Sequence, residues 1–257
     1  MTNQRGKHWL LLRGLARESA HWGSFIPLLQ STFPDAQIST LDLVGTGQFY
    51  QDNSPRSIKA ITDIARRQAV ERGLLEQPVT ILALSLGGMV AWEWMKNYPD
   101  DINGATLINT SFANLSPFYQ RLRWQSYWRF FSLLRLRHVY QRELAIVQLV
   151  NNSRHLDDQI ARDWGQIQTL RPVSMKNMLQ QIIAASRYRP DNTQPNVPVL
   201  LLNAQGDRLV APACSAAIQQ RWQLELRTHI WAGHDLTQDD GAWVVAQLQD
   251  WLTTTGV

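Results

Sequence analysis

The chain has 257 residues, of which 44% are apolar and 18% charged, and it contains one cysteine. This composition excludes a disordered or collagen-like chain, and the single Cys214 excludes an internal disulfide framework and a cysteine-cluster metal site. Apolar runs such as Val197–Leu202 are far shorter than the roughly 20 residues that a helix needs to span a bilayer. We identify no signal peptide, and we expect a cytoplasmic protein without stable membrane anchoring.

The net charge of +4 is unevenly distributed along the chain. Residues 112–190 include 12 basic and 4 acidic residues, whereas the rest of the chain includes 13 basic and 17 acidic residues. This segment is also rich in aromatic residues, and it ends in the turn-rich stretch 189–198. We therefore predict a core formed by residues 1–111 and 191–257, with residues 112–190 as an inserted helical cap.

The parts of the chain that flank this insertion alternate between predicted strands and helices. In chain order, the expected elements are strand His8–Arg13, helix Ala20–Thr32, strand Gln37–Asp42, helix Ser57–Arg72, strand Val79–Leu84, helix Leu86–Tyr98, strand Ala105–Asn109, strand Val197–Asn203, helix Pro212–Trp222, strand Leu224–Trp231 and helix Asp240–Leu252. Continuous apolar strands such as Val199–Leu202 are typical of a sheet that is buried on both faces. The alternation predicts an α/β fold with a doubly wound, mostly parallel sheet of about six strands.

A serine follows the predicted strand Val79–Leu84 and directly precedes a predicted helix. Ser85 lies between Ala83 and Gly87, and small residues at these two positions allow a sharp turn between strand and helix. Such an elbow exposes the hydroxyl over the edge of the sheet, where the helix N-terminus stabilises negative charge. Taken alone, the same pattern also fits a serine that caps the start of a helix.

Two later strand ends supply an acid and a base. Asp207 follows the strand Val197–Asn203, and His234 follows the last predicted strand. A serine hydroxyl becomes a good nucleophile when an imidazole removes its proton, and a buried carboxylate holds that imidazole in the right tautomer. The chain order Ser85, Asp207, His234 therefore predicts a catalytic triad at the carboxyl ends of the strands.

With these motifs the chain resembles the α/β-hydrolase superfamily across nearly its whole length. Residues 11–15, which read Leu-Leu-Arg-Gly-Leu, and the downstream Trp22 look like the His-Gly segment of that family, and residues 41–47 are similar to its Asp-Leu-Pro-Gly-x-Gly loop. In architecture the chain looks closest to small bacterial carboxylesterases of the pimeloyl-carrier methyl esterase type. The resemblance implies that the backbone N–H groups of Leu15 and Leu86 form an oxyanion hole.

Arg13 departs from the family pattern, and Asn109 excludes an alternative position for the acid of the triad. Arg13 replaces the usual histidine, and we expect it either to pair with an acid at a neighbouring strand end, with Asp42 as the candidate, or to direct a cation toward the acyl site. The pairing is the favoured interpretation. Asn109 occupies the alternative position for the acid, so Asp207 is the candidate that remains.

The remaining histidines do not suggest a second site. None follows a strand end at a suitable turn, and no pair of them has zinc-ligand spacing with a carboxylate. No glycine-rich phosphate loop follows a strand, so we predict neither a metal nor a nucleotide cofactor. These histidines are His8, His21, His138, His155 and His229.

Residues 116–150 of the insertion are typical of one or two helices in which apolar and basic residues alternate. Three interpretations remain open: an apolar face that covers the sheet under solvated arginines, an acyl pocket with arginines that attract an anionic substrate or acidic carrier, or a helix that lies on a membrane surface. Nucleic-acid binding is the least supported, because no nucleic-acid motif accompanies the charge. The arginines are Arg121, Arg123, Arg129, Arg135, Arg137 and Arg142.

Together these observations predict a carboxylesterase that cleaves esters of small to medium size through Ser85, His234 and Asp207. We expect its substrate to be a small-molecule ester, including anionic or carrier-bound ones. Two alternatives remain open: an acyltransferase or lyase that uses the same triad, and a ligand-sensing protein of the same fold with negligible turnover.

Overall fold

The computed structural model describes residues 6–133 and 135–254, without the side chains of Phe130 and Phe131. In that part of the chain, six parallel strands form one sheet in the order β2-β1-β3-β4-β5-β6. This order confirms the predicted doubly wound α/β fold. The strands are β1 (His8–Leu12), β2 (Gln37–Leu41), β3 (Val79–Leu84), β4 (Ile102–Ile108), β5 (Val199–Ala204) and β6 (Glu225–His229).

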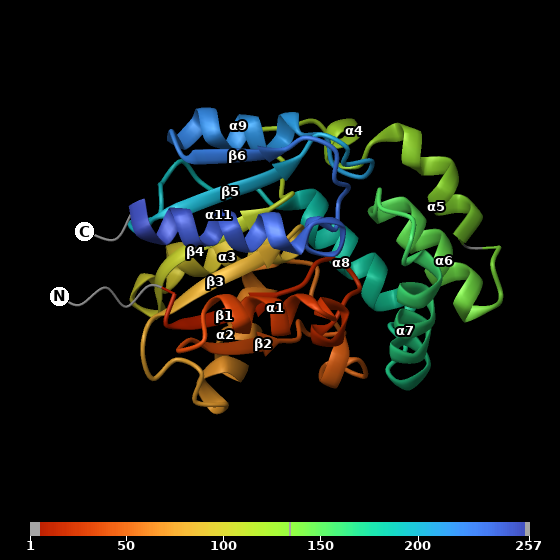
Figure 1. Cartoon of the computed structure of the whole chain (residues 1–257), viewed down its shortest axis with the longest axis horizontal. Coiled ribbons are helices and arrows are strands. Elements are labelled where there is room, and N and C mark those ends of the chain that lie inside the picture. The colour runs from red at the N-terminus through yellow and green to blue at the C-terminus, as the bar shows by residue number, and fades with distance from the viewer. Residues whose placement is uncertain (1–5, 134, 255–257) are drawn as a thin grey trace.

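Helices cover both faces of the sheet, because successive side chains of a strand point to opposite faces. Leu10 and Leu12 of β1 belong to one apolar cluster, whereas Trp9 and Leu11 belong to a second cluster on the other side. Figure 1 shows α1 and α11 in front of the sheet. The first cluster includes residues of α2 (Ile58–Glu71), α3 (Leu86–Asn97) and α9 (Ala213–Trp222), and the second includes residues of α1 (Phe25–Thr32) and α11 (Gly241–Thr254).

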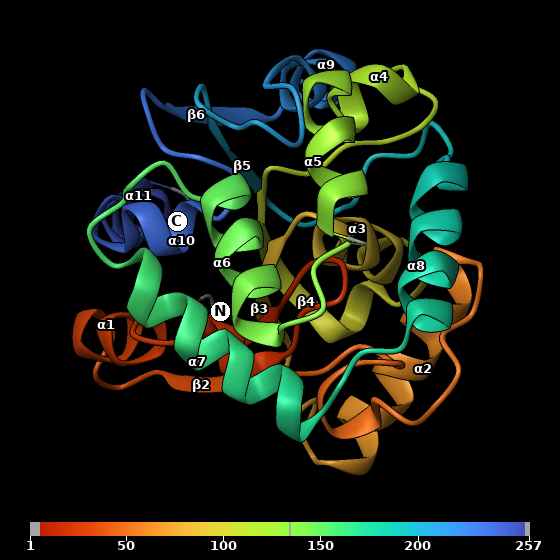
Figure 2. The same ribbon diagram turned by 90° about the vertical axis from the view of Figure 1, so that its right-hand side faces the viewer.

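The segment between β4 and β5 forms further helices at the carboxyl ends of the strands (Figure 1), and Figure 2 looks directly at them. Val147 and Trp164 belong to a small apolar cluster between α6 and α7 that is separate from the two clusters at the sheet. All of these helices lie within residues 112–190, and the assignment of that segment as a cap domain stays a prediction. The helices are α4 (Phe118–Arg121), the 3-10 turn η4 (Trp124–Ser126), α5 (Tyr127–Leu133), α6 (Val139–Val150), α7 (Asp157–Leu170) and α8 (Met175–Arg187).

The structure corrects two expected helices. The helix expected at Ala20–Thr32 is divided into a 3-10 turn at Ser19–Trp22 and α1, because Gly23 between them has a φ of 50° that a continuing helix cannot adopt. Residues 116–150 form α4, η4, α5 and α6 rather than one or two helices. The break before η4 occurs at Arg123, whose backbone is extended.

Two expected strands differ at one end. The strand that we expected to begin at Ala105 begins at Ile102. The prediction began too late because Gly104 interrupts the run of apolar residues that indicates a buried strand in the sequence. The last strand ends at His229 rather than Trp231, because Ile230 is 82% exposed and has left the buried sheet. The other boundaries agree within the one or two residues by which strand and helix ends commonly differ. None of the helices in the described ranges is long and apolar enough to cross a membrane.

Candidate active site

Ser85 lies on a sharp turn between β3 and α3. Its φ of 58° is unusual for a residue other than glycine, and such strain persists only where the surroundings hold it. The backbone N–H of Ser85 donates to the Ile108 carbonyl over 2.8 Å, and its carbonyl accepts from the Thr110 hydroxyl over 2.8 Å. A Cβ at Gly87 would lie 2.7 Å from the Leu12 carbonyl oxygen, so the start of α3 approaches the end of β1 too closely for a larger residue.

The Ser85 side chain does not cap the helix that it precedes. Ser57 and Ser174 stand at the starts of α2 and α8, and the side chain of each accepts a hydrogen bond from a backbone N–H in the first turn. The hydroxyl of Ser85 makes no such bond at the start of α3. The capping interpretation, which the sequence alone left open, therefore does not account for this serine.

Asp207 is buried at the carboxyl end of β5 and is held by backbone groups. Its Oδ1 accepts hydrogen bonds from the N–H groups of Leu209 over 2.7 Å and Val210 over 2.9 Å, while its Oδ2 lies 2.7 Å from Nδ1 of His234. An ionised carboxylate can only accept, so Nδ1 of His234 carries the proton of this pair. Asp207 thus fixes the tautomer that leaves Nε2 free to act as a base.

His234 is 6% exposed and lies in the turn that follows β6. Burial alone lowers the pKa of a histidine, but the charge of Asp207 and its hydrogen bond outweigh burial here. They raise the pKa of His234 above its usual value of 6.5. The negative charge of the neighbouring Asp235 acts in the same direction, whereas Arg13 opposes it.

Asn109 links the histidine turn to the end of β4, a role that the sequence did not reveal. Its side-chain amide donates to the carbonyl oxygen of His234 over 2.8 Å, and its Oδ1 accepts from the N–H of Ala204 over 3.1 Å. Since Ser85 bonds to the preceding residue Ile108, the turns of Ser85 and His234 are attached to adjacent residues of one strand end. The available signal was an asparagine at a strand end, since asparagine tolerates the left-handed backbone conformation that Asn109 adopts here, with a φ of 49°.

Of the two hydrogen bonds of a triad, the one between His234 and Asp207 is present, whereas the one between the Ser85 hydroxyl and His234 is not formed in this structure. Among the described residues, the hydroxyl of Ser85 has no hydrogen-bond partner. Catalytic hydrogen bonds are often long without substrate and tighten in the substrate complex, so this geometry leaves the predicted roles of Ser85, Asp207 and His234 as predictions.

The predicted oxyanion groups are the N–H groups of Leu15 and Leu86. Leu86 directly follows Ser85 in sequence, and Leu15 belongs to a segment that approaches Ser85 in space. Leu86 is the first residue of α3, whose N–H has no partner within the helix. Leu15 follows Gly14, and a Cβ at Gly14 would lie 3.1 Å from Cβ of Ser85. Neither N–H has an acceptor in the described part of the chain. Both N–H groups are thus free to donate to a group outside the protein, as the groups of an oxyanion hole must be.

Arg13 pairs with Asp235, and the expected partner Asp42 is wrong. The two terminal nitrogens of Arg13 contact the carboxylate of Asp235 at 3.3 and 2.5 Å, and both side chains are 3% exposed. Arg13 outweighs the effect of burial and lowers the pKa of Asp235. Asp42 instead accepts from the N–H and hydroxyl of Ser19, in the segment that follows β1. Arg13 is therefore a paired structural cation.

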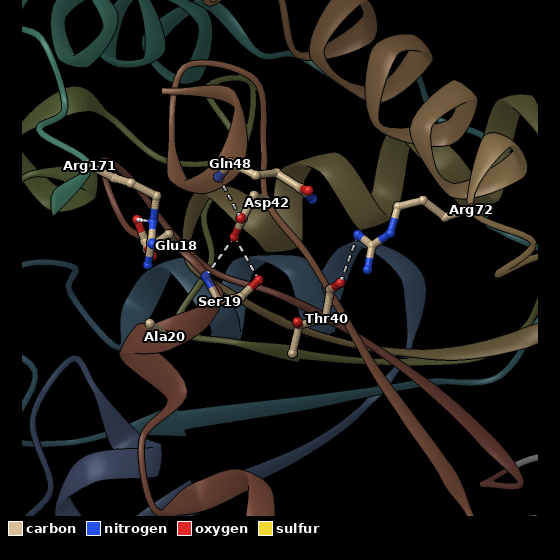
Figure 3. A pocket seen from close by; sticks show the side chains of 8 residues that line it. All are labelled: Glu18, Ser19, Ala20, Thr40, Asp42, Gln48, Arg72 and Arg171. Atoms are coloured by element: carbon tan, nitrogen blue, oxygen red, sulfur yellow. Dashed lines mark hydrogen bonds and ion pairs between the residues drawn. The ribbon is translucent and has the colours of Figure 1, made fainter. Parts of the chain in front are cut away.

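A hollow of about 350 Å³ lies beside β2, away from the predicted triad. Figure 3 shows that its carboxylates are already engaged: Asp42 with Ser19 and Gln48, and Glu18 with Arg171. Arg72 donates to the carbonyl oxygen of Thr40 at the edge of the sheet. None of the predicted site residues lines this hollow, and its polar groups hold loops and strands together.

A second buried histidine provides a useful contrast to His234. His229 at the end of β6 is 4% exposed, and its Nδ1 accepts a hydrogen bond from the N–H of Ala232 over 3.0 Å. Its Nε2 lies 3.2 Å from Asp240. Both ring nitrogens are thus satisfied by the protein, as in a structural histidine. No group of three or more potential metal ligands among His, Cys, Asp and Glu occurs in the described ranges.

Three solved structures share the fold over nearly the whole chain. An esterase from Rhodococcus sp. ECU1013 has a TM-score of 0.75 at 15% identity and covers 100% of this chain and 94% of its own. A thermophilic esterase from Thermogutta terrifontis has a TM-score of 0.71 at 19% identity, with coverage of 98% and 92%. An enol-lactonase from Burkholderia xenovorans LB400 has a TM-score of 0.72 at 16% identity, with coverage of 96% and 91%.

These structural similarities show the fold alone, whereas the comparison with family models also shows the family. Among curated proteins, none matches this chain by sequence. The model of the family described as serine aminopeptidase, S33, matches residues 32–240, a range that includes Ser85, Asp207 and His234. The chain therefore belongs to the serine aminopeptidase S33 family of α/β-hydrolases.

Proposed function

We propose that the protein is a serine hydrolase that cleaves carboxylic esters of small to medium size. The observation that carries this proposal is the buried pair of His234 and Asp207, with Nδ1 and Oδ2 2.7 Å apart, at the same sheet edge as the strained elbow of Ser85. In this mechanism Nε2 of His234 takes the proton of the Ser85 hydroxyl, whose oxygen attacks the ester carbonyl.

After this attack, the reaction proceeds through an acyl-enzyme that water then hydrolyses. The N–H groups of Leu15 and Leu86 stabilise the negative oxygen that forms on the attacked carbon. His234 then donates its proton to the leaving alcohol, and an acyl group remains on Ser85. A water molecule, deprotonated by His234, attacks this acyl-enzyme and releases the acid. Asp207 stays ionised throughout and stabilises the imidazolium form of His234.

The charge of the inserted helices favours a neutral or anionic substrate over a peptide with a free amino terminus. An aminopeptidase binds an ammonium group, for which acidic side chains are the natural partners. Residues 112–190 instead have a balance of 12 basic to 4 acidic residues. We propose on this ground that an ester, including one with a carboxylate in its acyl chain, is preferred to an aminoacyl amide.

The test is a panel of p-nitrophenyl esters of increasing chain length, with and without a terminal carboxylate, alongside aminoacyl p-nitroanilides. The Ser85→Ala variant should lose about 10³-fold or more of kcat/KM on every ester. Ser57→Ala is the matched control, because Ser57 caps α2 and its loss removes no proposed nucleophile. Equal ester hydrolysis by the wild type and Ser85→Ala would overturn the proposal, and faster cleavage of the anilides would overturn the substrate preference.

Two alternative functions can be distinguished from ester hydrolysis with the same protein variants. An acyltransferase would transfer the acyl group to an added alcohol or amine instead of water, which product analysis detects. A ligand-sensing protein would bind an ester without turnover, so its rate would equal that of Ser85→Ala.

A further inference from the structure

The chain between Asp101 and Glu143 contains six arginines and no acidic residue. In the structure this stretch includes α4, η4 and α5. Arg129, Arg135 and Arg137 are exposed, and none of the three forms an ion pair within the described ranges. Their positive charge therefore faces solvent without neutralisation from the protein itself.

The same elements expose four large aromatic side chains. The exposed fractions are 51% for Phe118, 59% for Tyr119, 64% for Trp124 and 70% for Trp128. Trp124 is the first residue of η4, and Trp128 lies four residues later in the first turn of α5. A cluster of large exposed rings marks an interaction site more often than a bare surface. We define the α4–α5 surface as Phe118, Tyr119, Trp124, Trp128, Arg129, Arg135 and Arg137.

This surface is concave beside α4, and aromatic rings and an arginine meet there. Tyr119, Arg123 and Trp124 line a hollow of about 470 Å³ that also borders the start of α9. Arg123 is fixed in place, since its guanidinium donates to the carbonyl oxygen of Asp207 over 2.6 Å. On α5, the guanidinium of Arg135 lies 5.8 Å from the ring centre of Trp128. Arginines thus lie beside aromatic rings at both places. Figure 2 shows α4 and α5 at the end of the molecule that the inserted helices form.

We propose that the α4–α5 surface docks reversibly on an anionic lipid surface. Tryptophan and tyrosine rings are suited to the head-group region of a bilayer, where an apolar body and a polar edge are both satisfied. Arginines beside them are attracted by anionic head groups. A soluble acidic partner would match the charge alone, whereas rings exposed by more than half also gain from an apolar environment. Docking of this kind needs no membrane-spanning helix and does not depend on the proposed hydrolysis.

The experiment is sedimentation of the full chain with vesicles of phosphatidylcholine, with and without phosphatidylglycerol. We expect binding to the anionic vesicles that falls as salt is added, because salt screens the attraction. The variant Arg129→Gln/Arg135→Gln should bind roughly 25-fold more weakly, given the contribution of each arginine near such a surface. The variant Trp124→Ala/Trp128→Ala should bind at least about tenfold more weakly.

Two matched controls separate this surface from exposed residues in general. Arg56→Gln/Arg67→Gln removes two exposed arginines at α2, and Leu170→Ala removes a side chain that is 69% exposed at the end of α7. Both controls should bind as the wild type does, and thermal unfolding verifies that every variant is folded. The proposal is overturned if the wild type ignores anionic vesicles, if the controls lose binding as much as the variants, or if heparin in solution binds as strongly as the anionic lipid.

Discussion

Arginine occupies two opposite environments in this protein. Arg13 at the end of β1 is 3% exposed and contacts the carboxylate of Asp235 with both terminal nitrogens. Arg129 and Arg135 on and after α5 are exposed and have no acidic partner in the described ranges. A buried charge must be paired because its desolvation is costly, whereas an exposed one keeps its charge available for a partner outside the molecule. The net charge of +4 therefore describes neither region.

The largest expected effect separates two buried histidines. His234→Gln should lower kcat/KM by about 10³- to 10⁴-fold, because it removes the proposed base that takes the proton of Ser85. His229→Gln should leave kcat/KM of the folded protein within a few-fold, since both ring nitrogens of His229 are used in the structure itself. It should lower the free energy of unfolding by about 1–3 kcal/mol, the cost of an unsatisfied buried group. Equal losses of activity in the two variants would contradict the assignment.

Removal of Arg13 should mainly affect stability. Arg13→Met leaves the carboxylate of Asp235 buried without its partner, and we expect the free energy of unfolding to fall by about 3–5 kcal/mol. The double variant Arg13→Met/Asp235→Leu should recover much of this loss, because it removes both charges. Arg129→Gln is the exposed control and should change urea unfolding by no more than about 0.5 kcal/mol. A stable Arg13→Met variant with a raised KM for anionic esters would instead indicate a substrate contact.

The pH dependence follows from the direction of the His234 pKa. His234 must be neutral to act as a base, and Asp207 raises its pKa above 6.5. The protein should therefore lose kcat/KM as the pH falls, and the midpoint of this loss should lie above 6.5, with a drop approaching tenfold per pH unit below it. A rate that is flat between about pH 5 and 8 would exclude a histidine base with a usual or raised pKa.

The smallest expected effect is on the α4–α5 surface. Trp124→Ala/Trp128→Ala should leave the melting temperature and the hydrolysis of a soluble short-chain ester nearly unchanged, since both rings are mostly exposed. If this variant unfolded at a clearly lower temperature, the rings would be part of the core of the insertion, and the contrast between the two regions would disappear.

The sheet could be predicted because its strands are continuous apolar runs, and the triad candidates because each follows such a run. The partner of Arg13 could not be predicted from the sequence. Residues 42 and 235 both follow strand ends, and only the three-dimensional path of their loops decides which of them meets Arg13. The role of Asn109 depends on hydrogen bonds to β5 and to the turn after β6, which are far away in sequence. Apolar periodicity in the insertion also did not reveal that Trp124 and Trp128 remain exposed.

The most direct test of the central claim is to locate the acyl group during turnover of a p-nitrophenyl ester. The protein is quenched in the first turnovers, and peptide mass spectrometry identifies the modified residue. We predict an adduct of the acyl mass on Ser85 and no adduct in the Ser85→Ala variant, together with a burst of nitrophenol in the wild type alone. An acyl group on another residue, or a burst that persists in Ser85→Ala, would contradict Ser85 as the nucleophile.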